Sequence, residues 1–230
     1  MSMLAAVVSV VAAVAWHNGR HLLPGPWREA AATVVTVIGA TLAAWWLFTR
    51  SNPARGLEGA WGWTLAALAI AGLVAVAARV SRRVGAAVAD RRMREMGSSE
   101  FALHVGWRIP ILTAFAEEVV YRGAVWWVLE RAGGSTLALW GTSVAFALGH
   151  VVVARDQAIR EDRGVVPWVL VTIGATGAAG ILLGLLRLST GGIWAPMGVH
   201  AAVNMALAVG ARHARDPDGL VASSAEIDMD

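Results

Sequence analysis

Residues 110–129 read PILTAFAEEVVYRGAVWWVL, a largely apolar run of 20 residues that contains Glu117, Glu118 and Arg122. About 20 such residues in a helix are enough to cross the hydrocarbon core of a bilayer. An ionised side chain at the bilayer centre costs roughly 2.5–3.5 kcal/mol on insertion scales, so three of them should face protein or water and bind one another. The stretch therefore predicts a membrane-spanning helix that carries a functional site.

The composition of the whole chain agrees with a membrane protein. Of its 230 residues, 57% are hydrophobic and 15% are charged, against roughly 45–50% and about 25% in soluble domains. The mean hydropathy of +0.59 excludes a disordered chain and a solvated coiled coil. All 19 basic residues are arginines, and all but Arg122 lie between apolar runs, so no nucleic-acid partner is expected. The absence of cysteine excludes disulfides, thiolate metal ligands and a cysteine nucleophile.

Apolar runs recur along the chain and predict an all-α fold, a polytopic transmembrane helical bundle with six to seven spans. The runs cover residues 3–16, 30–48, 61–78, 110–129, 136–154, 165–186 and 193–209. The first run has about 14 residues, which is short for a span. Ala13-Val14-Ala15 resembles a signal-peptide cleavage site, but no basic residue precedes the run, which favours an uncleaved helix.

The chain divides into three expected parts. Residues 1–100 hold the N-terminal helices and an arginine-rich cytoplasmic segment, residues 101–211 form the core that carries the site, and residues 212–230 form a disordered tail. The polar residues 79–100 are expected to form a solvated amphipathic helix. With seven helices, the loops after the first, third and fifth helices carry eleven arginines, against six assigned to the other side. The positive-inside rule then places residues 79–100 in the cytoplasm.

Polar side chains inside the later spans are the candidate functional residues. Glu118 and Arg122 are four residues apart and share a helix face, whereas Glu117 points about 100° away. His150 lies near the expected cytoplasmic end of the fifth helix, at a depth where it could meet Glu117. His200 and Asn204 are four apart on the seventh helix.

A carboxylate and two imidazoles suit water activation with oxyanion stabilisation, binding of a divalent metal, or proton relay. Ser143 and Ser189 have no nucleophile motif around them, which argues against acyl-enzyme chemistry.

The remaining histidines and glycines have simpler interpretations. His17, His21 and His213 are expected in solvated loops or the tail, and His104 could line the cytoplasmic mouth of the site. Phe146 is expected to be a packing residue. Four glycines of the sixth helix predict close helix packing: Gly174, Gly177, Gly180 and Gly184.

Three motifs in order resemble the CPBP intramembrane proteases, the family of CAAX-processing and bacteriocin-processing, Abi-type enzymes. They are Glu117-Glu118-x-x-x-Arg122, Phe146-x-x-x-His150 and His200-x-x-x-Asn204. The stretch LRLSTGGIWAP at residues 186–196 also resembles the run that precedes the last motif of that family. Each motif alone is weak, but three in order on consecutive core helices are specific. The resemblance covers about residues 110–208.

The resemblance implies an intramembrane endopeptidase with a catalytic cavity between the fourth, fifth and seventh helices. Glu117 and His150 would activate water, His200 and Asn204 would stabilise the oxyanion, and Glu118 and Arg122 would organise the site. The family is labelled both metalloprotease and metal-independent. A divalent metal such as zinc on Glu117, His150 and His200, or no cofactor, therefore stays open.

The implied partners are the lipid bilayer and a peptide or protein substrate, which is CAAX-like, lipidated or otherwise membrane-tethered. The implied location is a bacterial cell membrane, in which the multi-pass chain turns its site towards the cytoplasm.

Two other functions use the same residues. A proton-coupled transporter would employ the buried groups as a relay, but the chain lacks the matched second half of common inverted-repeat carriers. A non-catalytic membrane scaffold would bind partners without chemistry, yet it would not need the two motif histidines. Replacing His200 by alanine separates a scaffold, which would keep its partner, from a protease, which would lose its activity.

Overall fold

The structure is a computed structural model that describes residues 1–22, 28–48 and 56–214. These residues form helices and turns and contain no strand, so the all-α expectation is confirmed. Of the tail predicted at residues 212–230, Arg212 and His213 belong to the last helix, so its start was placed too early, and residues 215–230 lie outside the described residues. The elements before the site are α1 (Met3–Leu22), α2 (Arg28–Phe48), α3 (Leu57–Val80), α4 (Arg82–Val88), α5 (Arg91–Glu95) and α6 (Ser98–Leu103). The elements of the core are η1 (His104–Phe115), α7 (Ala116–Glu118), η2 (Val119–Val125), α8 (Trp126–Gly149), α9 (Val151–Arg160), α10 (Val165–Thr190) and α11 (Trp194–His213).

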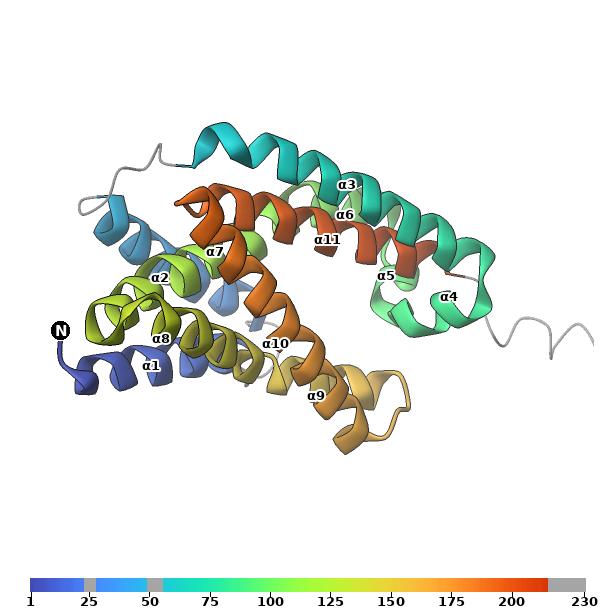
Figure 1. Cartoon of the computed structure of the whole chain (residues 1–230). Coiled ribbons are helices and arrows are strands. Elements are labelled where there is room, and N and C mark those ends of the chain that lie inside the picture. The colour runs from blue at the N-terminus through green and yellow to red at the C-terminus, as the bar shows by residue number, and fades with distance from the viewer. Residues whose placement is uncertain (23–27, 49–55, 215–230) are drawn as a thin grey trace, which may run out of the picture.

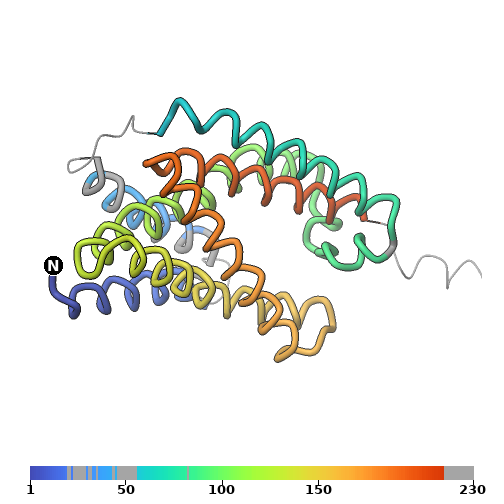
Figure 2. Tube along the Cα trace, in the orientation of Figure 1, coloured from blue at the N-terminus to red at the C-terminus, as the bar shows by residue number. Residues whose placement is uncertain are grey.

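Two layers of helices enclose the central segment η1–α7–η2. α3 and α11 lie along one side and α1 and α8 along the other, while α10 crosses between them (Figure 1). α3 and α11 run in the same direction, as the Cα trace shows (Figure 2). Gly198 lies against Thr64, and Gly210 lies further along against Ala78. Small residues at these crossings let the two backbones approach closely.

The fourth predicted span begins earlier than its apolar run. Pro110 was expected at its start, but it lies inside η1, and helical structure is continuous from Ser98. η1 and η2 have wide π-helical turns, and α7 between them carries the two glutamates. The break predicted between the fourth and fifth helices is present at Gly133 and Gly134. Gly134 has φ +81°, a conformation that favours glycine.

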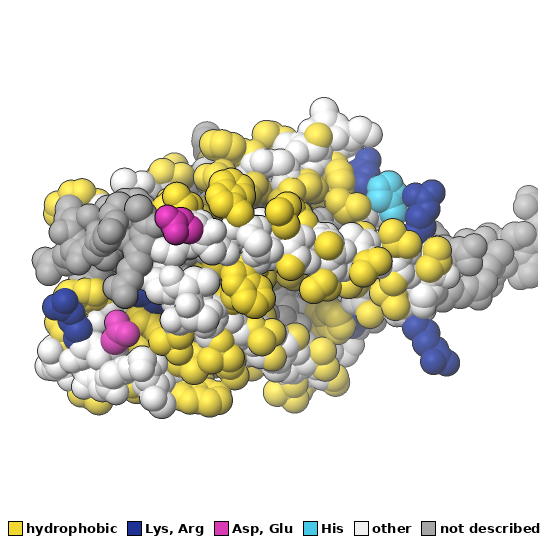
Figure 3. All heavy atoms as spheres, turned by 45° about the horizontal axis from the view of Figure 1, so that its top comes forward, with side chains coloured by type: hydrophobic (Ala, Val, Ile, Leu, Met, Phe, Trp, Pro, Cys, Tyr) yellow, Lys and Arg dark blue, Asp and Glu magenta, His cyan; other side chains and the backbone are white. Residues whose placement is uncertain are grey.

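Three described segments are long and apolar enough to cross a membrane: Leu57–Val80, Ser98–Arg160 and Val165–Thr190. The second turns back at Gly133 and Gly134, so it contains both the fourth and the fifth predicted helix. Met3–Gly19 is a shorter apolar helix. Large apolar side chains such as Leu73 and Leu182 are 70% and 63% exposed. Hydrophobic side chains cover the middle of the face in Figure 3, with charged ones towards its ends, as a lipid-facing surface requires.

The polar residues 79–100 do not form the single amphipathic helix expected from their charges. α3 ends at Val80, and α4, α5 and the start of α6 follow as short helices because caps interrupt the chain. Ser81 accepts a hydrogen bond from the Val84 amide, and Asp90 accepts one from the Arg92 amide. Burial alone would raise the pKa of Asp90, but its hydrogen bonds and ion pair with Arg92 hold the pKa below its usual value.

Several helix ends lie close together on one side of the molecule, in an arginine-rich layer formed by α4, α5, the α9–α10 turn and the end of α11. Arg163 donates to the carbonyl of Ala86, and the Arg91 amide donates to Glu161, so the α9–α10 turn lies beside α4 and α5. Arg212, near the end of α11, donates to the carbonyls of Met93 and Met96. The arginine count from the sequence placed Arg212 among the six arginines on the side opposite residues 79–100, and this assignment was wrong. α11 is the seventh helix and runs parallel to α3, so both helices end in this layer.

Candidate active site

Glu117 and Glu118 lie side by side on α7 in the interior of the bundle. Glu117 is 1% exposed, and Glu118 and Arg122 are 0% exposed. Their segment lies between the two layers of helices (Figure 1). Three charged side chains at this depth need charged or hydrogen-bonding partners, because burial of an isolated charge is very unfavourable. The two glutamates find different partners, as their angular separation on the helix predicts.

Glu118 is the centre of a charged cluster that joins four elements. The Arg122 Nη1 atom lies 2.9 Å from Glu118 Oε1, as expected for residues four apart on a helix. The His200 Nδ1 atom lies 2.9 Å from the same oxygen. Arg122 also donates from Nη2 to the carbonyl of Gly180 at 3.1 Å. One carboxylate thus connects α7, η2, α10 and α11.

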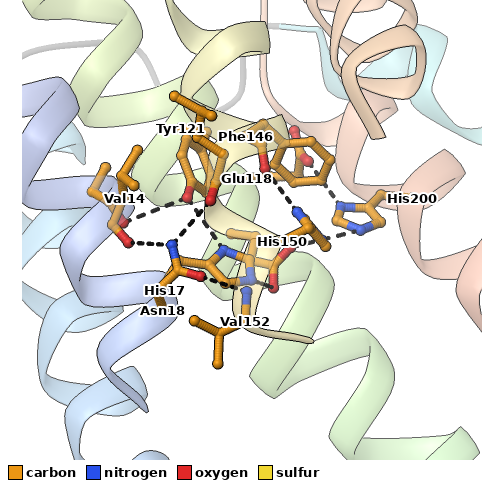
Figure 4. Close-up of polar contacts among 12 residues, drawn as sticks. Val14, His17, Asn18, Glu118, Tyr121, Phe146, His150, Val152 and His200 are labelled. Atoms are coloured by element: carbon orange, nitrogen blue, oxygen red, sulfur yellow. Dashed lines mark hydrogen bonds and ion pairs between the residues drawn. The ribbon is translucent and has the colours of Figure 1, made fainter. Parts of the chain in front are cut away.

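Glu117 faces the histidines. Its Oε1 atom lies 3.6 Å from His17 Nε2, and its Oε2 atom lies 3.9 Å from His200 Nε2. His200 therefore lies between the two glutamates, with Nδ1 towards Glu118 and Nε2 towards Glu117. This arrangement fixes the ring plane of His200, and Figure 4 shows the imidazole at the edge of the group.

His150 reaches Glu117 as the sequence predicted. It lies at the junction of α8 and α9, where its Nδ1 donates to the carbonyl of Phe146 at 2.7 Å. Its ring centroid is 4.6 Å from that of His17. One ligand atom each from His17, Glu117 and His150 lies within 4.8 Å of the other two. Side chains from α1, α7 and the end of α8 thus converge at one point (Figure 4).

His17 was expected in a solvated loop, and this expectation was wrong. α1 extends to Leu22, six residues beyond the apolar run, and His17 on it is 1% exposed. Asn18 explains why the polar end of the helix stays packed. Its amide donates to the carbonyl of Leu148, and its oxygen accepts from the amide of Val152. A sequence signal was present, because 14 apolar residues are too few for a span, so the helix must extend into polar residues.

Tyr121 and Gly149 shape the pocket around His17. The Tyr121 hydroxyl lies 3.2 Å from His17 Nδ1 and donates to the carbonyl of Ala13 at 3.5 Å. A Cβ atom on Gly149 would come within 2.6 Å of the Tyr121 hydroxyl and 3.0 Å of the His17 ring. Glycine at this position therefore makes the His17–Tyr121 contact possible.

Phe146 forms an aromatic wall beside the charged groups. Its ring centroid lies 4.6 Å from that of His150, 5.6 Å from that of His200 and 5.3 Å from that of Tyr121. The Arg122 guanidinium lies 4.4 Å from the same ring, a distance at which cations attract aromatic faces. Phe146 is thus a packing residue, as expected.

Other predicted residues lie at the margin of the site or away from it. Asn204 is on α11, one turn after His200, and is partly exposed; within the described residues its side chain makes no hydrogen bond. His104 is partly buried at the start of η1, and His213 is exposed at the end of α11. Ser143 and Ser189 donate their hydroxyls to helix carbonyls, those of Leu139 and Leu186. The side chain of His21 lies outside the described residues.

The candidate metal ligands differ from the predicted set. Glu117, His150 and His200 were expected to hold a metal if one binds. Among the described residues, the compact group consists of His17, Glu117 and His150, and His200 is outside it. Two imidazoles and one carboxylate form a known catalytic zinc set. The same side chains can also act directly on a water as proton acceptors.

Comparison with known proteins agrees with this location of the site. Residues 99–206 match the family described as Type II CAAX prenyl endopeptidase Rce1-like. The matched segment runs from α6 into α11 and contains every predicted site residue: Glu117, Glu118, Arg122, His150, His200 and Asn204. His17 precedes it. Comparisons with curated proteins and with solved structures found no match.

Proposed function

Residues 99–206 belong to the Type II CAAX prenyl endopeptidase Rce1-like family, and from this premise we propose that Glu117 and His150 activate the water that cleaves a peptide bond. The family and the apolar helices make the chain an integral membrane endopeptidase of the CAAX type that acts on a peptide or protein. The observation that best supports the proposed chemistry is the convergence of Glu117 and His150, from separate motifs, within the interior of the bundle.

The proposed reaction is a two-step hydrolysis. Glu117 and His150 together hold the water. Glu117 accepts a proton from this water as the water oxygen bonds to the scissile carbonyl carbon. The carbonyl oxygen becomes an oxyanion, which His200 and Asn204 stabilise. The proton then passes to the amide nitrogen as the C–N bond breaks, which releases an acid and an amine.

Glu118 and Arg122 act in this proposal as positioning residues. Glu118 accepts from His200 Nδ1 and so orients the ring that would face the oxyanion. Arg122 holds Glu118 in place through its contacts with Gly180 and Phe146. Loss of Glu118 or Arg122 should therefore change the position of the His200 ring more than that of the Glu117 carboxylate.

Cleavage of a prenylated CAAX peptide tests the proposal. The purified protein in detergent is incubated with a quenched fluorescent peptide in prenylated and unprenylated forms, which also tests whether lipidation is required. Glu117→Gln keeps the size of the side chain but removes the proton acceptor, and we expect the rate to fall by about 10²–10⁴-fold. Glu130→Gln is the matched control, because Glu130 lies on the exposed face of α8.

Equal cleavage by the wild type and Glu117→Gln would overturn the assignment of Glu117. Absence of cleavage of both peptides by the wild type would contradict the CAAX substrate class. In the expected result, Glu130→Gln cleaves at the wild-type rate and Glu117→Gln is nearly inactive. His200→Ala should also be inactive while retaining the folded state, which contradicts a scaffold whose binding does not need that ring.

A further inference from the structure

We propose that His17, Glu117 and His150 form a binding site for one divalent transition-metal ion of the zinc class. The site includes a residue of α1 that precedes the family segment. The inference rests on the proposed function in one respect, since the ion would lie where Glu117 and His150 activate water. Its test measures metal rather than cleavage, so the two proposals can fail separately.

The spacing of the ligand atoms fits a shared ion. His17 Nε2 and Glu117 Oε1 are 3.6 Å apart. Zinc binds imidazole nitrogen at about 2.0–2.1 Å and carboxylate oxygen at about 2.0–2.2 Å, which sets two ligand atoms of a tetrahedral ion roughly 3.3 Å apart. His150 completes a group whose ligand atoms all lie within 4.8 Å of one another.

Both imidazoles have the outer hydrogen bonds that orient metal-binding histidines. His150 donates from Nδ1 to the carbonyl of Phe146, which can only accept. The lone pair of the neutral ring is then on Nε2. The Tyr121 hydroxyl lies 3.2 Å from His17 Nδ1, while His17 Nε2 faces Glu117 Oε1 at 3.6 Å. A backbone carbonyl or polar group at the second ring nitrogen is the usual support of a metal ligand.

The two glutamates would have different cationic partners. Arg122 supplies the cation for Glu118, while an ion between His17, Glu117 and His150 would add positive charge on the side of Glu117. His200 lies outside this compact group of ligand atoms. Three protein ligands leave one position of a tetrahedral ion for water, and zinc lowers the pKa of such a water towards 7.

Direct measurement of bound metal tests the site. The protein is prepared without a histidine tag, stripped with a chelator and titrated with Zn²⁺ by calorimetry, and the bound zinc is counted by elemental analysis. Co²⁺ is titrated in parallel, because its visible absorption reports tetrahedral ligands. We expect one equivalent of zinc in the wild type and at least about a tenfold weaker affinity in His17→Ala, since even loss of an outer-shell partner weakens metal sites about 10–100-fold.

Two further variants keep the test decisive. Tyr121→Phe leaves all three ligands in place but removes the hydroxyl that orients His17, and its affinity should fall by about 10–100-fold. This variant preserves the packing if His17→Ala fails to fold. His213→Ala removes an exposed histidine at the end of α11 and should bind zinc as the wild type does.

Three outcomes would overturn the inference. They are no zinc binding by the wild type, equal binding by the wild type, His17→Ala and Tyr121→Phe, or a loss that also appears in His213→Ala. Peptide cleavage by the stripped, metal-free protein would reject the ion as a participant and leave the proposed function intact. Zinc binding together with no cleavage would support this site and contradict the proposed function instead.

Discussion

Adjacent glutamates on one helix have different electrostatic environments in this protein. Glu118 binds a permanent cation, Arg122, and the ring of His200. Glu117 faces the imidazoles of His17 and His200. The two carboxylates thus have different neighbours, which is the physical ground for proposing a structural role for Glu118 and a chemical role for Glu117.

Breaking the buried ion pair should destabilise the protein strongly. Arg122→Met leaves the Glu118 charge buried with only His200, and we expect a loss of about 3–5 kcal/mol of unfolding free energy. The double variant Glu118→Gln/Arg122→Met should lose less than the sum of the single losses, because neither charge is then left alone. Unfolding in a mixed-detergent titration measures both. The exposed pair Arg91–Glu95 is the control, and Arg91→Met should have no measurable effect. Additive losses at residues 118 and 122 would contradict the pairing.

Most residues of the candidate site could be predicted from the sequence, but the place of His17 in that site could not. Glu117, Glu118, His150 and His200 are charged or titratable within apolar runs, where such residues are rare and need partners. His17 follows the first apolar run and looked like the start of a loop. Its burial depends on the packing of α1 against α8 and α9, a tertiary contact that no local pattern contains.

Helix packing at the level of elements sets the position of the charged cluster. On α10, Gly177, Gly180 and Gly184 pack against α8, where their nearest contacts are Ala147, Ser143 and Leu139. The prediction of close packing is confirmed for these three glycines and is wrong for Gly174. A Cβ atom on Gly174 would have no neighbour within 4 Å, and the residue faces outward. The period of the glycines was visible in the sequence, but the face that meets α8 was not.

Gly180→Ala should therefore lower the stability of the protein much more than Gly174→Ala. A Cβ atom at residue 180 would lie 3.0 Å from the Cα atom of Ser143, so one backbone must move. The expected loss is about 1–3 kcal/mol, as for overpacked cores. The carbonyl of Gly180 accepts from Arg122, so cleavage should also fall as the cluster shifts. Gly174→Ala should be neutral or stabilising by up to about 1 kcal/mol. Thermal unfolding in detergent compares the two, and equal effects would contradict the crossing.

The turn before α11 shows which local features sequence does specify. Gly191 ends α10 with φ +73°, the left-handed conformation expected of a glycine at a helix C-terminus. Trp194 begins α11, and Pro196 lies in its first turn, where a missing amide proton has no cost. The apolar runs predicted the order of the long helices. The short helices between residues 82 and 103 depended on capping contacts and were not predicted.

At the scale of the whole molecule, one polar layer contains the ends of α3, α9 and α11. Arg163 and Arg212 both reach the backbone of the segment between α3 and α6. Asn18 connects the end of α1 to Leu148, next to His150. On α11, His200 lies nearer to the start of the helix than to the end that is in this layer. The side of the membrane on which the layer lies sets the orientation of the whole bundle.

The excess of arginines predicts that this layer is cytoplasmic, and cysteine labelling can test it. The chain contains no cysteine, so single-cysteine variants have no background. Glu58 at the start of α3 and Arg83 on α4 are exposed and lie beyond opposite ends of the apolar part of α3. In intact cells, a membrane-impermeant maleimide should label Glu58→Cys and leave Arg83→Cys unlabelled. After permeabilisation both should react, while the cysteine-free wild type stays unlabelled. Labelling of Arg83→Cys but not Glu58→Cys in intact cells would reverse the orientation.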